Sequence, residues 1–347
     1  MVKISGTGGS TGTAGVTRSV PELEDLAARG LERAGTRSDA ARSVARALVK
    51  ANADGLASHG LARLPTYCAQ VRAGKVDGGA VPTGSRLGAS GARIDAGSGF
   101  AFPALDLAIE MAAEMARETP VVALAVTNSH HFGIAGHHVE RLAERGLVGL
   151  IFGNSPAGIA PWGGARPLFG TNPIAFACPL PDLPPLVVDV SLSKQARGKV
   201  MIAAREGRPI PEGWAIDSGG RPTTDPEAAL AGSMLPMGDA KGAALALAVE
   251  VLSAALTGAN FGYEASSFFD DKGGPPRVGQ FMLALAPEPF SDGTFLDRVG
   301  RLVDAILAEP NTRLPGSRRL AARAKSEAEG IELPAGLHSE LQAAAGG

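Results

Sequence analysis

Cysteine is scarce in this sequence of 347 residues. The two cysteines, Cys68 and Cys178, stand far apart, and neither belongs to a CxxC pair or to a cysteine–histidine spacing that binds zinc. This argues against a disulfide-stabilised secreted domain and against a zinc finger. So little cysteine fits a reducing compartment, and we expect a cytoplasmic protein.

A large excess of charge of either sign is also missing. The 33 basic and 35 acidic residues leave a formal net charge of −2. Nucleic acids and anionic membrane surfaces select strongly basic proteins, so this balance supports neither partner. We expect a small molecule as the ligand.

The N-terminus lacks the apolar run that a signal peptide needs, and no run in the sequence is long enough to span a membrane. Its first residues, MVKISGTGGSTGTAG, are rich in glycine, and we expect residues 1–16 to form a flexible tail. The most apolar helical stretch, 242–258, contains Glu250 and falls short of the roughly 20 apolar residues that cross a bilayer. This stretch predicts a buried core helix.

Glycine motifs for nucleotide binding are absent as well. The run GTGGSTG at 6–12 does not meet the pattern G-x-G-x-x-G, and no predicted strand precedes it. Gly198 and Lys199 are followed by Val200, which does not complete a P-loop. These residues by themselves predict no dinucleotide site.

What the sequence does contain is, first, a helical beginning. Ser19 and Glu22 have the spacing of a capping box at the start of an amphipathic helix. A second helix is predicted from Ser38 and a third near 61–73, from the spacing of their apolar residues. We therefore expect 17–85 to be a helical N-terminal part.

From about residue 92 the pattern changes to alternating strands and helices. The apolar strands 121–127 and 146–153 flank a helix at 134–145, which predicts a βαβ unit and a parallel sheet with both faces covered. Further strands are expected at 92–96, 174–178, 186–190 and 279–285, further helices at 103–115, 194–205, 242–257 and 294–308, and loops at 206–226 and 270–277. We expect an α/β domain over 86–286, with 287–347 packing against the N-terminal part.

Histidines gather in two short segments, DGLASHGLAR (54–63) and NSHHFGIAGHH (128–138). His131 follows the end of a predicted strand, where α/β enzymes build their sites. Four histidines in the second segment raise the alternative of a metal site, but HExxH and paired carboxylates are absent, and we expect no metal. His137 and His138 are expected to be partly exposed helix residues.

The first segment could serve a reductase. Such an enzyme needs a proton donor with a pKa near neutral and a cation for a substrate carboxylate. His59 and Arg63, four residues apart, could lie on one face and supply both groups, whereas a helix-terminal histidine capped by Ser58 is the alternative.

Two further charged residues stand near predicted element ends. Asp189 ends the apolar strand LVVDV, where it could orient a histidine or accept a backbone or ionic contact. Lys241 precedes a hydrophobic helix and could contact an anion at its N-terminus, or be simply solvated.

Taken in order, these segments resemble the malate/L-lactate dehydrogenase type 2 family over about residues 18–335. The resemblance rests on DGLASHGLAR, SHHFG (129–133), NSPAGIAPWGG (154–164), PLFGTNPIAFACP (167–179), VVDVSLSKQARGK (187–199), IPEGWAID (210–217), TTDP (223–226), AKG (240–242) and RLPG (313–316). It implies a non-Rossmann α/β fold with a mixed sheet, a homodimer, and an oxidoreductase that uses NADH or NADPH on a small carboxylic acid.

Site residues carried over by the resemblance fall into three groups. His59 matches the proton donor, Ser58 and Asp189 match its proposed partners, and His131 matches a histidine that some members use as the acid/base instead. Arg63 matches the arginine that holds the substrate carboxylate. The residues implied for the cofactor are His131, Phe132, Gly133, Ser155, Thr171, Asn172, Asp189, Val190, Ser191, Leu192, Ser193, Lys194, Lys241, Gly242, Arg313, Leu314, Pro315 and Gly316.

The resemblance leaves three functions open. The first is reduction of a 2-oxo acid, equivalently oxidation of a 2-hydroxy acid, and the second is reduction of a cyclic ketimine such as piperideine- or pyrroline-2-carboxylate. Segments 202–208 and 256–261 are similar to piperideine-2-carboxylate reductases. The third is a family member that has lost turnover, against which the retained Ser58, His59 and Arg63 argue.

Overall fold

The computed structural model describes residues 15–346. Most of the expected tail therefore lies outside the described residues, and Val16 already belongs to strand β1 (Val16–Arg18). Within residues 15–346, no helix combines the length and the hydropathy that a membrane crossing requires.

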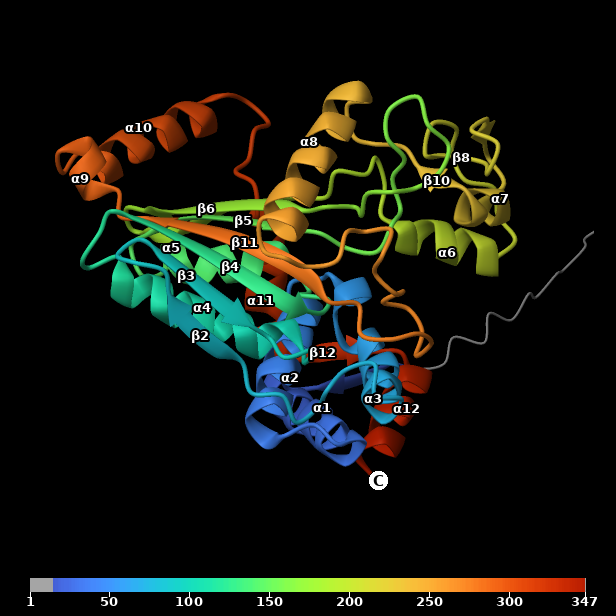
Figure 1. The fold of residues 1–347 in the computed structure, drawn as a ribbon. Helices are drawn as coiled ribbons and strands as arrows, with labels where there is room; N and C mark the ends of the chain where they lie inside the picture. The colour runs from blue at the N-terminus through green and yellow to red at the C-terminus, as the bar shows by residue number, and fades with distance from the viewer. Residues whose placement is uncertain (1–14, 347) are drawn as a thin grey trace, which may run out of the picture.

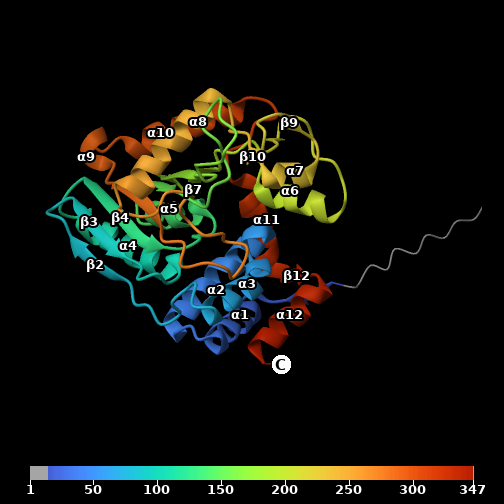
Figure 2. The same cartoon turned by 45° about the vertical axis from the view of Figure 1, so that its right-hand side comes forward.

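The N-terminal helices form one lobe together with the end of the chain (Figures 1 and 2). The predicted capping box is present. Ser19 caps α1 (Val20–Ala34), and the Glu22 carboxylate accepts a hydrogen bond from the Ser19 N–H. The helices α2 (Ser38–Ala53) and α3 (Leu64–Arg72) follow, α12 (Ala335–Ala345) packs on α1, and β12 (Ile331–Leu333) pairs antiparallel with β1. The two ends of the described chain thus complete one core.

A seven-stranded sheet forms the centre of the larger lobe, in the order β2-β3-β4-β11-β5-β6-β7. Its strands are β2 (Thr83–Arg86), β3 (Gly91–Asp95), β4 (Val121–Ser129), β5 (Val148–Gly153), β6 (Ile174–Leu180), β7 (Leu183–Val190) and β11 (Val278–Leu285). Only β3 and β4 pair in parallel. The prediction of a mixed sheet is confirmed.

The expected parallel sheet is wrong, although β4, α5 and β5 do form a βαβ unit in which β4 and β5 run in the same direction. Strand β11, from late in the chain, lies between β4 and β5 and pairs antiparallel with both. Its Met282 and Ala284 are fully buried among the residues of the main core, so β11 is stabilised where it lies by both ladders and by packing. Local periodicity around 121–153 carries no information about a strand that arrives from 278–285.

Helices cover both faces of this sheet (Figure 1). The helices α4 (Ala101–Met115) and α5 (Ala135–Ala143) pack on one face. On the other face lie α8 (Ala240–Glu250), its π-helical continuation η3 (Val251–Ala255) and α10 (Phe295–Ala308), which contacts β6. Thus α10, in the segment 287–347, lies on the sheet, whereas α11 (Ser317–Glu329) and α12 contact the N-terminal helices.

The expectation of a fully buried core helix at 242–258 is wrong. Ala246 and Val249 face the protein interior, but Leu247, Val251 and Leu256 are each more than half exposed. Apolar residues lie on both sides of this helix, so the sequence could not distinguish an interior helix from a surface helix with an uncovered apolar face.

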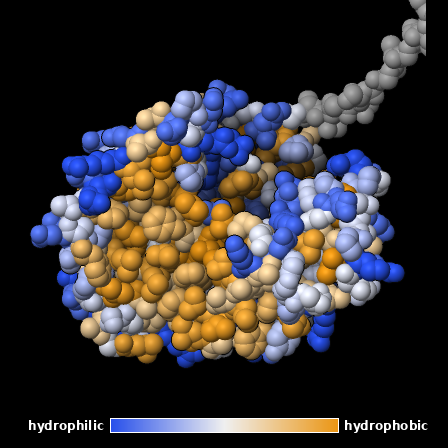
Figure 3. Space-filling view, turned by 90° about the horizontal axis from the view of Figure 1, so that it is seen from above, coloured by the Kyte–Doolittle hydropathy of each residue, from blue (hydrophilic) through white to orange (hydrophobic). Residues whose placement is uncertain are grey.

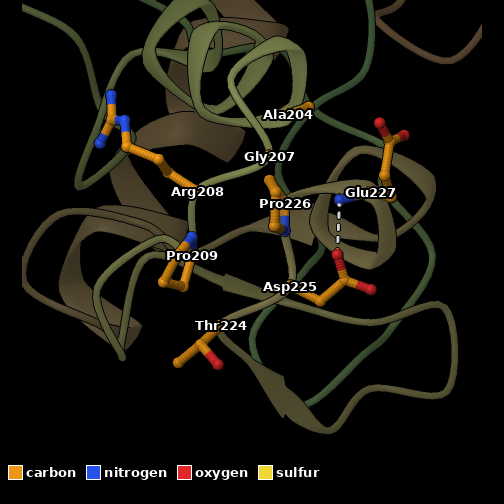
Figure 4. A pocket seen from close by; sticks show the side chains of 8 residues that line it. All are labelled: Ala204, Gly207, Arg208, Pro209, Thr224, Asp225, Pro226 and Glu227. Atoms are coloured by element: carbon orange, nitrogen blue, oxygen red, sulfur yellow. Dashed lines mark hydrogen bonds between the residues drawn. The ribbon is translucent and has the colours of Figure 1, made fainter. Parts of the chain in front are cut away.

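A small unit lies beside the main sheet. It consists of the three-stranded sheet β10-β8-β9, helix α6 (Arg197–Arg205) and helix α7 (Pro226–Ala231). The strands are β8 (Ala215–Ile216), β9 (Pro222–Thr223) and β10 (Ser233–Met234), so part of the expected loop 206–226 is extended structure. Figure 4 shows a pocket of about 380 Å³ between α6 and α7, lined in part by Arg208, Asp225 and Glu227.

Candidate active site

Two short 3₁₀ turns hold the first histidine segment in place. The turns η1 (Ala57–His59) and η2 (Leu61–Arg63) connect α2 to α3, and the Asn52 side chain accepts a bond of 2.6 Å from the Leu61 N–H. Gly60 permits this close approach, since a Cβ there would lie 1.9 Å from Asn52 Oδ1. The turn therefore has a fixed shape where it presents His59 and Arg63.

The structure brings His59, Arg63 and His131 together. Ser58 Oγ lies 3.1 Å from His59 Nδ1, and the imidazoles of His59 and His131 are stacked with their centres 5.7 Å apart. Arg63 donates from Nε to the Ser58 carbonyl at 3.0 Å and forms no ion pair with any of residues 15–346. A cation without a carboxylate partner thus stands beside two histidines.

Burial keeps both histidines neutral in the free chain. It lowers the pKa of His59 to about 4, with the positive charge of Arg63 and the neighbouring His137 adding to the effect. Burial likewise holds the pKa of His131 well below its usual value, and Arg63 and His59 act in the same direction. These pKa values are lower than the near-neutral one that the sequence suggested for a proton donor, because the sequence does not show burial.

Tyr67 also belongs to the group formed by His59, Arg63 and His131, although no sequence pattern indicated it. Its hydroxyl lies 2.5 Å from His131 Nδ1, and burial raises the pKa of Tyr67, so the hydroxyl stays protonated. Arg63, Tyr67 and the buried Gln70 follow at helical spacing along one face of η2 and α3. That spacing was the available signal, but a buried tyrosine in a helix is equally typical of an ordinary core position.

The segment 261–276 closes one side of the site. Phe268 packs edge-on against His131 with ring centres 5.3 Å apart, and the Arg63 guanidinium lies 4.5 Å from the centre of the Phe269 ring. The sequence indicated a loop at 270–277, and nothing local to it indicated contact with residues 200 positions earlier.

His137 and His138 were expected to be partly exposed, and that expectation is wrong, because both are buried. His137 Nε2 lies 2.8 Å from Asp54 Oδ2, inside a buried ionic cluster that joins three helices. The cluster consists of Lys50, Asp54, His137, Glu140, Arg319 and Arg323, from α2, the residue after it, α5 and α11. Helix α11 therefore links the N-terminal lobe to the sheet.

Within residues 15–346, the Asp189 carboxylate forms no hydrogen bond to His59 or His131. Its Oδ2 accepts a bond of 2.7 Å from the Gly136 N–H at the start of α5. The residue is exposed at the end of β7, yet nearby protein raises the pKa of its carboxyl, against the opposing effects of Gly136 and Arg319. Of the alternatives for Asp189, the structure shows the backbone contact.

Many of the residues implied for the cofactor gather near the N-terminus of α8. Ser155 Oγ accepts a bond of 3.1 Å from the Thr171 N–H, and Leu192 donates its N–H to the Thr171 carbonyl at 2.8 Å. The Lys194 ammonium lies 2.9 Å from Asp239 Oδ1, just ahead of Lys241 and Gly242 in the first turn of the helix.

Other residues implied for the cofactor are buried in the protein or lie beside β7. Asn172 is buried and donates to the Ala246 carbonyl and the Glu250 carboxylate at 2.9 and 3.0 Å. Phe132 is buried, and its ring fills the space that a Cβ at Gly153 would need, 2.4 Å away. The turn 313–316 lies beside β7, since a Cβ at Gly316 would stand 3.6 Å from the Val187 carbonyl.

The donor set at the α8 N-terminus suits a phosphorylated ligand. Asp239 makes no side-chain capping bond, so the first-turn N–H groups of α8 are not capped by it. The exposed side chain of Lys241 adds positive charge at the same place, and Lys194 lies beside it in an ion pair with Asp239. Uncapped N–H groups and cations at a helix start together favour an anion. The residues present therefore fit the diphosphate of a nicotinamide cofactor. The pocket of Figure 4 includes none of the residues implied for the site.

Comparison with known proteins gives consistent findings over nearly the whole chain. Residues 19–342 match the family model of malate/L-lactate dehydrogenase. A (2R)-3-sulfolactate dehydrogenase (NADP(+)) from Chromohalobacter salexigens is 54% identical, with 94% of this chain and 97% of that protein covered. A Δ1-pyrroline-2-carboxylate/Δ1-piperideine-2-carboxylate reductase from Pseudomonas putida is 42% identical, with 92% and 94% covered.

Solved structures agree with these sequence matches. The Δ1-piperideine-2-carboxylate reductase from Pseudomonas syringae superposes with a TM-score of 0.90 at 40% identity, covering 95% of this chain and 99% of that one. The sulfolactate dehydrogenase from Methanocaldococcus jannaschii gives 0.87 at 31% identity, with 95% and 96% covered.

Proposed function

The chain belongs to the malate/L-lactate dehydrogenase family, and from that premise we propose that it reduces the C2 carbonyl of a small 2-oxo acid. It is an NAD(P)H-dependent oxidoreductase that acts on small carboxylic acids. In the reverse direction the same site oxidises a 2-hydroxy acid. The observation that carries the proposal is the unpaired Arg63 beside His59 and His131.

In this proposal Arg63 binds the substrate carboxylate. A planar guanidinium offers two parallel N–H donors to a carboxylate, and Nε is already held by the Ser58 carbonyl, so the terminal nitrogens remain for the substrate. The neighbouring histidines then lie on the side where C2 and its oxygen come to rest. The reduced nicotinamide supplies the hydride to C2.

His59 delivers the proton to the C2 oxygen, and Ser58, 3.1 Å from His59 Nδ1, orients its ring. His131, held by Tyr67, would contact the cofactor and is the alternative proton donor. Asp189 contributes through the Gly136 N–H by fixing the start of α5. Binding of the substrate carboxylate offsets the charge of Arg63, which removes one cause of the low pKa of His59.

Reduction of a cyclic ketimine is the second candidate. It is supported by the reductase from Pseudomonas syringae, whose structure matches over nearly the full chain. The same Arg63 would hold the carboxylate, and the same histidine would protonate nitrogen instead of oxygen.

The cofactor residues proposed here are those named from the resemblance, with Lys241, Lys194 and the α8 N-terminus binding the diphosphate. We also propose the division into a helical lobe over 17–85, packed with the C-terminal segment, and a cofactor-binding part over 86–286. A cytoplasmic location is supported by Cys68 and Cys178, which are both free thiols and buried.

A homodimer is proposed as well. Helices α8 and α10, together with η3 and α9 (Glu288–Ser291), carry exposed apolar side chains on one side of the molecule. These residues are Leu245, Leu247, Val251, Leu256, Phe290, Leu296, Leu302 and Leu307. Figure 3 views the molecule from this side and shows a broad apolar area. A second copy of the chain is the occupant we propose, because large uncovered apolar areas are typical of subunit interfaces.

A substrate panel tests the function. Pyruvate, oxaloacetate, sulfopyruvate, phenylpyruvate and piperideine-2-carboxylate are offered in turn, with loss of NADH and then NADPH absorbance as the measurement. We expect turnover of at least one 2-oxo acid. Turnover of the ketimine alone would select the second candidate, and turnover of none would contradict both.

A further inference from the structure

The segment 261–276 is an Ω-shaped loop with a closed base. Asn260 donates its N–H to the Arg277 carbonyl at 2.8 Å, and its side chain donates to the Pro276 carbonyl at 3.0 Å. Arg277 directly precedes β11, the central strand of the sheet. The two ends of the loop are therefore fixed, and its middle reaches the site from a rigid support.

Two buried side chains hold the tip of this loop from below. Gln70 donates from Nε2 to the Phe268 and Asp270 carbonyls at 3.3 and 2.9 Å. The Lys75 ammonium donates to the Asp270 carbonyl at 3.0 Å and to the Lys272 carbonyl at 2.6 Å, and lies 3.3 Å from Asp270 Oδ1. Lys75 is only 1% exposed. A buried ammonium needs such a set of oxygens, so the loop tip and Lys75 fix each other.

This support determines where Phe269 stands. The Arg63 guanidinium lies over the Phe269 ring, with 4.5 Å between the guanidinium carbon and the ring centre. One face of the guanidinium is thereby covered, and Nε is held in the plane by the Ser58 carbonyl at 3.0 Å. The terminal nitrogens stay available to a carboxylate that approaches edge-on, in the plane of the guanidinium, which is the geometry of two parallel hydrogen bonds.

We propose that Phe269 is a positioning residue: it orients Arg63 so that the guanidinium can bind the substrate carboxylate. Gln70 and Lys75 hold the loop that carries Phe269. The inference rests on the proposed role of Arg63. It assigns 261–276 as a specificity loop: the loop selects substrates whose carboxylate lies in the guanidinium plane. Because Gln70 lies on the same helix face as Tyr67 and Arg63, one short helix sets both the substrate cation and the loop that orients it.

The test compares Phe269→Leu with Phe269→Tyr. Leucine removes the aromatic face, and we expect the KM for the 2-oxo acid to rise about 2- to 30-fold, the range for a lost cation–π contact, with kcat and cofactor affinity nearly unchanged. Tyrosine keeps the face and should restore the wild-type KM. Leu87→Ala, on the exposed turn between β2 and β3, is the control and should change nothing. Lys75→Met should raise KM in the same way, and if it fails to fold, the Phe269 pair still decides.

A binding measurement separates failure of this inference from failure of the proposed function. The dissociation constant of oxamate, an isostere of pyruvate, is measured by calorimetry with cofactor bound, and it does not depend on turnover. If Arg63→Lys weakens oxamate but Phe269→Leu does not, the positioning role is wrong while the role of Arg63 stands. If wild-type protein binds no oxamate and turns over no member of the panel, both are overturned.

Discussion

The positive charge of Arg63 and the protonation of the neighbouring histidines oppose each other. Arg63 must remain charged to bind a carboxylate, although burial lowers its pKa somewhat, and its charge in turn disfavours protonation of His59 and His131. Substrate binding resolves the conflict, because the carboxylate neutralises the arginine at the moment when a histidine must carry a proton.

Replacing Arg63 by lysine tests the carboxylate contact. Lysine keeps the charge but cannot form two parallel hydrogen bonds, so KM for the 2-oxo acid should rise about 10-fold or more. Cofactor affinity, followed by fluorescence titration of NAD(P)H, should stay normal. A variant with weakened cofactor and an unchanged KM would assign Arg63 to the cofactor instead.

Separate alanine variants distinguish the two histidines. Loss of a positioned acid costs roughly 10²–10⁴-fold in rate, so His59→Ala should lower kcat by at least two orders of magnitude with cofactor binding intact. His131→Ala should also weaken the cofactor. Near-normal kcat in His59→Ala together with an inactive His131→Ala would exchange the two roles.

The pH profile of reduction belongs to the same prediction. Reduction needs the protonated imidazole, so the rate is lost as pH rises through the pKa of the donor. Because the pKa of His59 is about 4 in the free chain, kcat/KM should fall with rising pH from below the usual histidine range. In the substrate complex the charge of Arg63 is offset, so kcat should fall at a higher pH than kcat/KM does.

The sequence identified the residues of this site better than their surroundings. His59, Arg63 and His131 could be named because histidine and arginine beside glycine-bearing turns are uncommon and the family motifs contain them. Tyr67, Gln70 and Lys75 could not be named, since the first two look like ordinary helix residues and Lys75 looks like an ordinary loop lysine until the loop 261–276 is seen against them. Burial, and therefore the low pKa values, needs the three-dimensional structure.

At the scale of elements, helix α8 carries Lys241 in its first turn, next to the ion pair of Lys194 and Asp239. Lysine in the first turn is unfavourable for a helix whose N-terminus is already positive, unless an anion binds there. Asp239 pairs with Lys194 and makes no side-chain cap, while the Lys241 N–H donates to the Gly238 carbonyl at 3.2 Å. The start of α8 is thus arranged for an external negative group.

Lys241→Ala tests this element. Cofactor binding should weaken by roughly 1–3 kcal/mol, the range for a hydrogen bond to a charged group. Lys325→Ala, on the exposed side of α11, is the control and should leave the NAD(P)H titration unchanged. Equal titration curves for the two variants would show that Lys241 is merely solvated.

Helix α11 depends on the buried ionic cluster for its position. Arg323 donates to both Asp54 and Glu140, so Arg323→Met leaves two buried carboxylates undercompensated and should lower the free energy of unfolding by about 3–5 kcal/mol. Chemical denaturation measures this, with the exposed Arg318→Met as the control.

The same cluster gives a pH dependence with a defined sign. Although burial alone would raise it, the pKa of Glu140 is lowered to about 2 by Arg319, Lys50 and Arg323. A carboxyl with a depressed folded-state pKa stabilises the protein above its unfolded value near 4.5, and this contribution is lost as pH falls toward 2. The loss of stability between these pH values should be smaller in Arg323→Met than in wild type.

At the scale of the whole molecule, the apolar surface of α8 and α10 predicts the assembly. Light scattering after size-exclusion chromatography should give twice the mass of one chain for wild type. Leu247→Glu should give one chain mass, because burying an unpaired carboxylate in an apolar interface is costly. Leu87→Glu, on the turn between β2 and β3, should remain a dimer. A monomeric wild type would contradict the proposal.

The order of strands also bears on how the protein is made. A ribosome releases β4 and β5 long before β11, and at ordinary synthesis rates the intervening chain takes on the order of ten seconds to appear. During that interval both nascent strands expose the edges that β11 will cover, and unpaired edges invite aggregation. The N-terminal helices wait longer still, since β12 and α12, which pack on them, follow β11 in the chain. The sheet therefore cannot be completed before residues 278–285 have been made, and the yield of the protein in a cell depends on protection of the unfinished sheet.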